Sequence, residues 1–351
     1  MSKFWIGRTS RTTVSQLVST IRGCLSEIDD LYQTMTMDLT RRAFLRSGTT
    51  AAAAAAGGCA TARAAAPAAV IDAHVHFYDP SRPGGVTWPP ATDALLYRTV
   101  LPADYRALPV PRLADGVIAV EASFDPEDNQ WLLDLAAREP LIVGVVGNLR
   151  PGDPAFESLL ARFARNPLFR GVRTREVSLE KGFADPAVVR DLRSVARHGL
   201  SFDVHFPPAW SAHAARLAQA VPDLRLIVNH VAGAPVTGGA PDGAWLRTID
   251  ALARHPQIYM KVSGLVEGTR HKAGDAPSDP AFYRPVLEAL WERLGPDRLI
   301  YSSNWPVSAR NAPLATVEAV ALDYFASKGQ RALNKVFREN ACAAYGCSLR
   351  G

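Results

Sequence analysis

Eight short apolar segments alternate with longer amphipathic segments, and this alternation constrains the fold more than any other feature of the chain. The apolar segments are residues 69–75, 116–120, 141–146, 169–173, 200–204, 224–228, 258–262 and 298–302. The amphipathic segments between them include 129–137, 154–163, 186–197, 209–220, 245–253 and 281–294. Short strands alternating with helices are typical of a parallel α/β sheet. Eight such units in about 280 residues match the usual size of a (β/α)8 TIM barrel.

A doubly wound open sheet is the alternative α/β arrangement. Its nucleotide-binding members carry a glycine-rich turn directly after the first strand. Here the first apolar segment is followed by His76-Phe77-Tyr78-Asp79-Pro80. The sequence therefore favours a single TIM barrel over residues 67–351, without a second domain. In such a barrel the chemistry lies at the carboxyl ends of the strands.

The first 66 residues have the pattern of a targeting segment. A basic stretch contains the pair Arg41-Arg42, and an alanine-rich apolar stretch and small residues follow it. This order is typical of a twin-arginine signal. We expect residues 1–66 to be a leader that the twin-arginine export machinery recognises, and we expect the mature protein to be periplasmic. Residues 1–34 are either part of this leader or lie upstream of the true start, at Met35 or Met37.

A weaker pattern within the leader predicts that the protein is anchored to a membrane by a lipid. Gly57-Gly58-Cys59 resembles a lipoprotein cleavage site, which would place a lipid anchor on Cys59. The apolar stretch is too short and too rich in alanine to predict a membrane span.

The charge of the chain is uneven. The net charge is +5, but residues 1–66 carry eight Lys and Arg against four Asp and Glu, whereas the remainder carries 31 against 30. Because the basic excess belongs to the leader, we expect no nucleic-acid partner and instead a small-molecule substrate. The four cysteines lack the spacing of a metal site or of a disulfide framework. No particular oligomeric state is predicted.

Histidines collect where the predicted strands end. The first apolar segment runs into His74-Val75-His76, and residues two apart on a strand point to the same side. Two imidazoles facing one way are a suitable beginning for a metal or acid–base site, although they can also simply pack at a strand end. His205 and His230 follow the fifth and sixth apolar segments. Four of the eight histidines therefore lie at predicted strand ends.

Other polar residues share these positions. Arg173 and Arg175 follow the fourth segment, and their planar guanidinium groups suit a substrate carboxylate; solvated ion pairs are the alternative. Residues 79–112, rich in Pro and Gly, form the longest connection and are expected to lie over the barrel mouth. Tyr78 and Trp88 either line this mouth or pack as core aromatics.

Several motifs, in order along the chain, carry a family resemblance. They are His74-Val75-His76 with Phe77-Tyr78-Asp79-Pro80, Thr87-Trp88-Pro89, Phe169–Arg173, Val228–Pro235, Ser302–Val307 and Phe337–Ala341. Over residues 70–347 the chain resembles the amidohydrolase-related lactonase family, which includes pyrone-dicarboxylate lactonase and the sugar-acid lactonases. The resemblance implies a TIM barrel that hydrolyses a lactone or related cyclic ester of a carboxylic or sugar acid.

The resemblance also implies roles for the histidines. His74, His76 and His205 would hold one divalent metal ion, with zinc the expected ion, or would polarise the substrate carbonyl in a metal-independent enzyme. His230 is a second candidate for metal ligand or proton shuttle.

One departure from the family pattern concerns the eighth strand. The family commonly has Ser-Asp-Trp-Pro there, whereas this chain has Ser303-Asn304-Trp305-Pro306. An amide does not accept a proton at neutral pH.

Three outcomes follow from this departure. Asn304 orients water or substrate while His205, His230 or Glu121 takes the proton. Alternatively, a metal held by His74, His76 and His205 lowers the pKa of its bound water. In the third outcome hydrolysis is lost, and the chain is a non-catalytic periplasmic ligand-binding protein.

Overall fold

The computed structural model describes residues 66–173, 185–205, 211–271 and 274–350. The leader with Arg41-Arg42 lies outside the described residues, as does Arg175. The expectations that concern them stay predictions.

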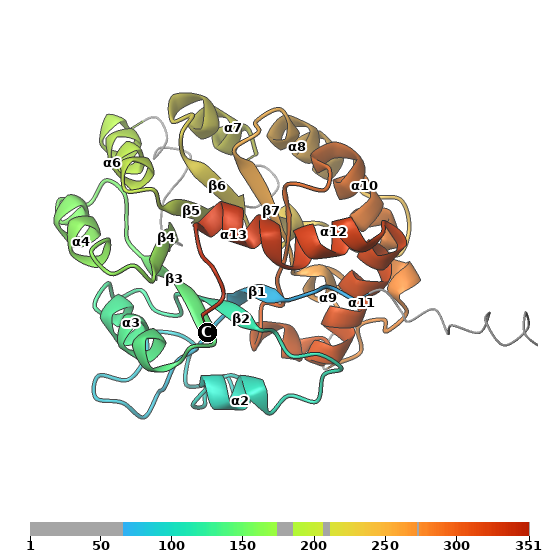
Figure 1. The fold of residues 1–351 in the computed structure, drawn as a ribbon, viewed down its shortest axis with the longest axis horizontal. Helices are drawn as coiled ribbons and strands as arrows, with labels where there is room; N and C mark the ends of the chain where they lie inside the picture. Colours follow the sequence, from blue (N-terminus) through green and yellow to red (C-terminus); the bar gives the residue numbers. More distant parts are fainter. Residues whose placement is uncertain (1–65, 174–184, 206–210, 272–273, 351) are drawn as a thin grey trace, which may run out of the picture. The chain divides into compact units, whose positions relative to one another are not determined.

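Eight parallel strands follow one another in chain order around a nearly closed barrel (Figure 1). They are β1 (Ile71–Val75), β2 (Gly116–Val120), β3 (Ile142–Asn148), β4 (Phe169–Arg173), β5 (Ser201–Val204), β6 (Arg225–Val228), β7 (Ile258–Val262) and β8 (Leu299–Tyr301). The first and last strands meet where Val75 bridges Trp305 and the His76 N–H donates to the Trp305 carbonyl at 2.9 Å. The predicted TIM barrel is confirmed, and the open doubly wound sheet is not the fold.

Helices lie around the outside of the barrel, except the last, which lies across one end of it (Figure 1). They are α2 (Pro102–Arg106), α3 (Asp128–Arg138), α4 (Phe156–Phe163), α6 (Pro186–Arg197), α7 (Ser211–Ala220), α8 (Gly243–Ala253), α9 (Leu265–Gly268), α10 (Arg284–Leu294), α11 (Leu314–Ser327), α12 (Gln330–Asn334) and α13 (Asn340–Tyr345). Single turns also form at His230–Gly233, Pro280–Tyr283, Val307–Arg310 and Lys335–Glu339.

Local sequence explains where two of these helices begin. Asp185 accepts a hydrogen bond from the Ala187 N–H at the start of α6, and Pro186 occupies the first helical position. Asp242 caps α8 in the same way. Such caps satisfy backbone N–H groups that the first turn leaves without partners.

The C-terminal helix α13 closes the barrel at the end opposite the strand tips. Asn340 donates its side-chain N–H groups to the carbonyls of Pro296 and Leu299, where β8 begins. The apolar face of α13 packs inside the barrel against residues of four strands, namely Ile71, Ile118, Ile227 and Ile300. The other end of the barrel is therefore left as the mouth.

The first part of the long connection 79–112 lies at that mouth, whereas its end reaches the start of β2, where Arg112 pairs with Asp115. Thr87 accepts a hydrogen bond from the Phe124 N–H beyond β2 at 2.8 Å, and Asp93 forms an ion pair with Arg310 beyond β8. The connection also contains α2, which no sequence pattern had indicated. These contacts hold it across the tips of the first, second and eighth strands.

No helix in the ranges that the structure describes combines the length and apolar character needed to cross a bilayer.

Candidate active site

A cavity of about 530 Å³ opens at the carboxyl ends of the strands. Six of the predicted site residues line it: His76, Trp88, Arg173, His205, His230 and Asn304. Other lining residues come from the turns that follow β6, β7 and β8, and they include Gly233, Pro235, Gly264, Glu267, Arg270 and Val307. This is the position at which TIM barrels carry their chemistry.

His74 lies one layer below the cavity, fully buried, and contacts His76 through the two Nε2 atoms at 3.2 Å. The neighbours indicate where the ring protons lie. His76 Nδ1 is 3.0 Å from the Val120 carbonyl, so it carries a proton and donates, and its Nε2 is an acceptor. Lys261 Nζ lies 3.1 Å from His74 Nδ1, so that nitrogen accepts. The remaining proton of His74 is therefore on Nε2 and is donated to His76.

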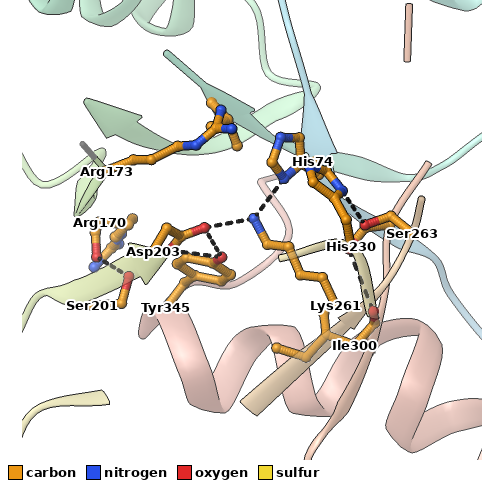
Figure 2. A network of polar contacts seen from close by, with 12 residues as sticks. His74, Arg170, Arg173, Ser201, Asp203, His230, Lys261, Ser263, Ile300 and Tyr345 are labelled. Carbon is orange, nitrogen blue, oxygen red and sulfur yellow. Dashed lines mark hydrogen bonds and ion pairs between the residues drawn. The ribbon is translucent and has the colours of Figure 1, made fainter. Parts of the chain in front are cut away.

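Lys261 extends from β7 into the barrel interior between His74 and Asp203 (Figure 2). Its ammonium is 2.7 Å from Asp203 Oδ2, and neither side chain is exposed. The Tyr345 hydroxyl of α13 donates to the same carboxylate at 2.9 Å. Burial lowers the pKa of Lys261 to about 8, while the neighbouring Asp203 opposes this shift. No pattern in the sequence had indicated a role for this lysine.

Burial and nearby cations keep the central imidazoles neutral. Desolvation lowers the pKa of His74 well below its usual value, and Lys261 adds to the effect. Desolvation, His205 and Arg173 act on the pKa of His230 in the same direction. Both rings are therefore hydrogen-bonding groups near neutral pH rather than charged ones.

His230 is held by an unusual turn at the tip of β6. His230, Val231 and Ala232 have φ values of 55°, 45° and 54°, in the left-handed region that residues other than glycine rarely adopt. The His230 Nδ1 atom pairs with the Ser263 hydroxyl at 2.9 Å. Gly264, with φ 71°, lies so close that an added Cβ would be 2.6 Å from the His230 Cβ. Strain of this kind is characteristic of functional sites.

Arg173 at the tip of β4 reaches the cavity beside Glu121, which follows β2. Their Nη1 and Oε1 atoms are 3.3 Å apart, and 7% and 2% of the two side chains are exposed. Because the pair is buried, the carboxylate fixes the guanidinium and offsets part of its charge. The guanidinium is thus presented to the cavity from a defined position.

The two predicted aromatic residues differ in position. Trp88 lines the cavity, with its ring 5.6 Å from that of His76. Tyr78 is 2% exposed, packs edge-on against Trp88 and donates its hydroxyl to the Leu96 carbonyl at 2.8 Å. Tyr78 therefore supports Trp88 rather than lining the cavity.

Glu267 in α9 is a functional candidate that no sequence pattern had indicated. It lines the cavity, and its Oε1 accepts a hydrogen bond from Asn304 Nδ2 at 2.8 Å. Burial raises its pKa, which the Asn304 hydrogen bond partly opposes. The only available signal was its place five residues beyond the end of β7, just outside the strand-end positions considered.

The described residues do not fit the predicted divalent ion as they stand. The Nε2 atom of His74 carries a proton and therefore has no lone pair for a metal. Moving that proton to Nδ1 would direct it at the Lys261 ammonium. No cluster of three or more His, Cys, Asp or Glu suited to an ion occurs in the part of the chain that the structure describes. The ligand set His74, His76 and His205 stays a prediction.

An eight-stranded barrel with neutral imidazoles, a guanidinium and a buried carboxyl group at its mouth defines a TIM barrel of the enzyme class. Within that class the chain belongs to the amidohydrolase family, whose model matches residues 71–347.

Two sequence relatives are named as lactonases. The L-fucono-1,5-lactonase of Burkholderia ambifaria is 32% identical over 286 residues, which cover 78% of this chain and 94% of the relative. An L-fucono-1,5-lactonase of Burkholderia multivorans is 28% identical over 249 residues, with coverage of 68% and 82%.

A solved structure supports the fold. The crystal structure of an amidohydrolase from Burkholderia multivorans with bound HEPES has a TM-score of 0.71 and 23% identity, and the match covers 80% of this chain and 100% of that one. A second crystal form of an amidohydrolase from the same organism, described with bound zinc, gives a TM-score of 0.70.

Proposed function

We propose that the protein hydrolyses a lactone, the internal ester of a sugar acid or a related carboxylic acid. The observation that carries the proposal is the similarity to L-fucono-1,5-lactonase, which extends over 94% of that relative's length. A sugar lactone has several hydroxyl groups around one ester carbonyl, and it needs a polar cavity of moderate size.

The cavity supplies such groups. His76, His205 and His230 offer ring nitrogens to hydroxyl groups, and the face of Trp88 suits the apolar side of a sugar ring. Arg173 offers a fixed positive charge where an oxyanion develops when water attacks the carbonyl. The same guanidinium suits the carboxylate of the hydroxy acid that ring opening releases.

A panel of sugar-acid 1,5- and 1,4-lactones tests the proposal, with acid release followed against the spontaneous rate. The protein without residues 1–66 is expected to hydrolyse at least one of them. Arg173→Met is expected to lower kcat/KM by about 100-fold or more, as loss of an oxyanion-stabilising group does. Absence of any turnover by the wild-type protein contradicts the proposal.

A non-catalytic ligand-binding protein is the second candidate, because Asn304 stands where the family commonly has a carboxylate. Calorimetric titration with the hydroxy acids of the same panel separates the two. Binding without turnover of any lactone favours the binding protein, and turnover excludes it.

We also propose that the twin-arginine machinery exports the protein to the periplasm. The support is the ordered pattern of residues 1–66, with Arg41-Arg42 ahead of the alanine-rich stretch. Fractionation of cells that express the full chain tests it. Arg41→Lys combined with Arg42→Lys is expected to leave the protein in the cytoplasm.

A further inference from the structure

Hydrolysis of an ester by water requires a group that takes a proton from the attacking water. Asn304 cannot do this, because an amide is not basic at neutral pH. His74 lies below the cavity and already accepts from Lys261. The lowered pKa of His230 makes it a weak base. Asn304, His74 and His230 are therefore poor candidates for this role, and Glu121 is already paired with Arg173.

Glu267 has the chemistry that is missing. Among the described residues that line the cavity, it alone carries a carboxyl group. One oxygen, Oε1, accepts from Asn304, whereas Oε2 has no hydrogen-bond partner among the described residues and is shielded from bulk solvent. An acceptor that is out of bulk water and without a partner is costly to keep unless it serves a function.

The residue at position 304 complements this carboxyl group. A second carboxyl group at 2.8 Å from Glu267 would raise one of the two pKa values, since both could not ionise together. An amide instead donates a hydrogen bond and keeps Glu267 ionisable. Asn304 also has φ 60°, a left-handed conformation that asparagine tolerates well. The pair therefore has one carboxylate and one donor, with the carboxylate on α9 instead of β8.

The backbone around Glu267 is held closely against the turn that carries His230. A Cβ added at Gly268 would lie 2.6 Å from the Ala234 carbonyl oxygen, and the Val236 N–H donates to the Gly268 carbonyl at 3.1 Å. Gly264 makes the equally close approach to His230. The carboxyl group is thus positioned by rigid contacts with the β6 turn on one side and by Asn304 on the other.

We propose that Glu267 is the general base that activates the attacking water, and that Asn304 is its positioning residue. This inference rests on the proposed lactone hydrolysis. One O–H bond of water breaks, its proton passes to Glu267, and its oxygen bonds to the lactone carbonyl carbon. The tetrahedral intermediate then breaks the C–O bond of the ring. Glu267 returns the proton to the leaving ring oxygen, which yields the hydroxy acid and the starting carboxylate.

The first test is Glu267→Gln, which keeps the shape of the side chain and removes the base. We expect kcat to fall by about 100- to 10,000-fold, the usual contribution of a general base, with KM little changed. The acid limb of the pH profile of kcat/KM is expected to disappear. A matched control is Glu292→Gln, on an exposed glutamate of α10 whose side chain is 64% exposed, and its activity should be that of the wild type.

The second test moves the carboxyl group across the hydrogen bond. Glu267→Gln combined with Asn304→Asp reverses donor and acceptor, and it is expected to be at least about tenfold more active than Glu267→Gln alone. This gain distinguishes a missing base from a disturbed cavity.

Asn304→Ala tests the positioning role. It removes the hydrogen bond that lowers the pKa of Glu267, so the acid limb should move to higher pH. Tyr283 before α10, whose pKa burial raises to about 12, interacts electrostatically with Glu267. The other ionisable side chains that line the cavity are His76, Arg173, His205, His230 and Arg270. Because the pKa of His230 lies well below its usual value, this ring can also titrate on the acid side. A shift that is lost when Glu267→Gln is combined with Asn304→Ala therefore reports on Glu267.

The outcomes separate this inference from the proposed function. Wild-type turnover with a kcat of Glu267→Gln within about threefold of it overturns the role of Glu267 alone. A double variant no more active than Glu267→Gln, with the same melting temperature, also overturns it. Absence of wild-type turnover overturns both the inference and the function on which it rests.

Discussion

The buried ammonium of Lys261 contacts two groups that depend on it, the His74 ring and the Asp203 carboxylate. Replacing Lys261 by Met would leave the buried Asp203 carboxyl group without the cation that pairs with it. Removing one partner of a buried ion pair typically costs about 3–5 kcal/mol. We expect the free energy of unfolding of Lys261→Met to fall by that amount in chemical denaturation.

A double variant provides the control for this loss. Lys261→Met combined with Asp203→Asn removes both charges, while the Tyr345 hydroxyl keeps an oxygen to which it can donate. It should recover part of the lost stability, because no unpaired charge is then buried. A cost below about 1 kcal/mol for the single variant would show that the pair is solvated.

The turn from β7 into α9 positions His230 in the cavity through a close contact at Gly264. Gly264 has φ 71°, and a Cβ there would lie 2.6 Å from the His230 Cβ. Gly264→Ala is expected to lower kcat/KM by at least about tenfold, because a displacement of about 1 Å in a catalytic group has effects of this size or larger. Steady-state kinetics and a melting curve measure the two effects separately.

Gly199 is the matched control for this variant. It also has a positive φ, 67°, but no atom within 4 Å of an added Cβ. Backbone strain in Gly199→Ala should therefore lower the free energy of unfolding by about 1–3 kcal/mol, without loss of activity. Equal loss of activity in both variants would mean that strain, and not the contact with His230, is responsible.

Helix α11 carries a buried carboxyl group outside the site. Glu318 is 2% exposed, and burial raises its pKa to about 7, with Asp72 adding to the shift. Between its ordinary pKa of 4.5 and about 7 the folded protein binds the proton more tightly than the unfolded chain. Stability from this group is therefore complete below pH 4.5 and is lost as the pH rises through 7.

Glu318→Gln tests this dependence. At pH 8 the variant should be more stable than the wild type by about 3–4 kcal/mol, since each pKa unit between 4.5 and about 7 corresponds to about 1.4 kcal/mol. At pH 4.5 the difference should nearly vanish. Denaturation curves at both pH values measure it, and a gain of equal size at both would point to packing instead of charge.

Helices and strands with a clear pattern of apolar residues were predictable from the sequence, whereas the short elements without such a pattern were not. The segments 116–120, 169–173 and 258–262 coincide with β2, β4 and β7, and 186–197 coincides with α6. The four-residue α9 has too few residues to show a helical period. Glu267 was missed for this reason, although the strand that precedes it was found.

Most of the predicted site residues meet at one cavity, whereas their hydrogen-bonding partners were not predictable. Strand ends indicated His76, His230 and Asn304, and all three line the cavity. The proton positions on His74 depend on the Lys261 ammonium, which comes from a strand 187 residues away. Such contacts are set by the three-dimensional arrangement, and neither composition nor spacing contains them.

At the scale of the whole molecule, the requirement for a metal ion is open to a direct test. Because His74 has no free lone pair, we expect lactone hydrolysis to persist after dialysis against EDTA, within about twofold of the untreated rate. Elemental analysis of the same sample gives the metal content. Loss of activity on chelation that zinc restores would show that the proton arrangement around Lys261 changes when an ion binds.

The junction between β1 and β8, which we call the seam of the barrel, affects the rate of folding. The Ser303 N–H donates to Asp72 across a separation of 231 residues, and His76 and Asn304 lie on either side of that seam. Contacts between residues so distant in sequence form slowly, because a long loop must close first. Refolding from denaturant should therefore restore helical circular dichroism early and hydrolytic activity late, when the two edges of the barrel join.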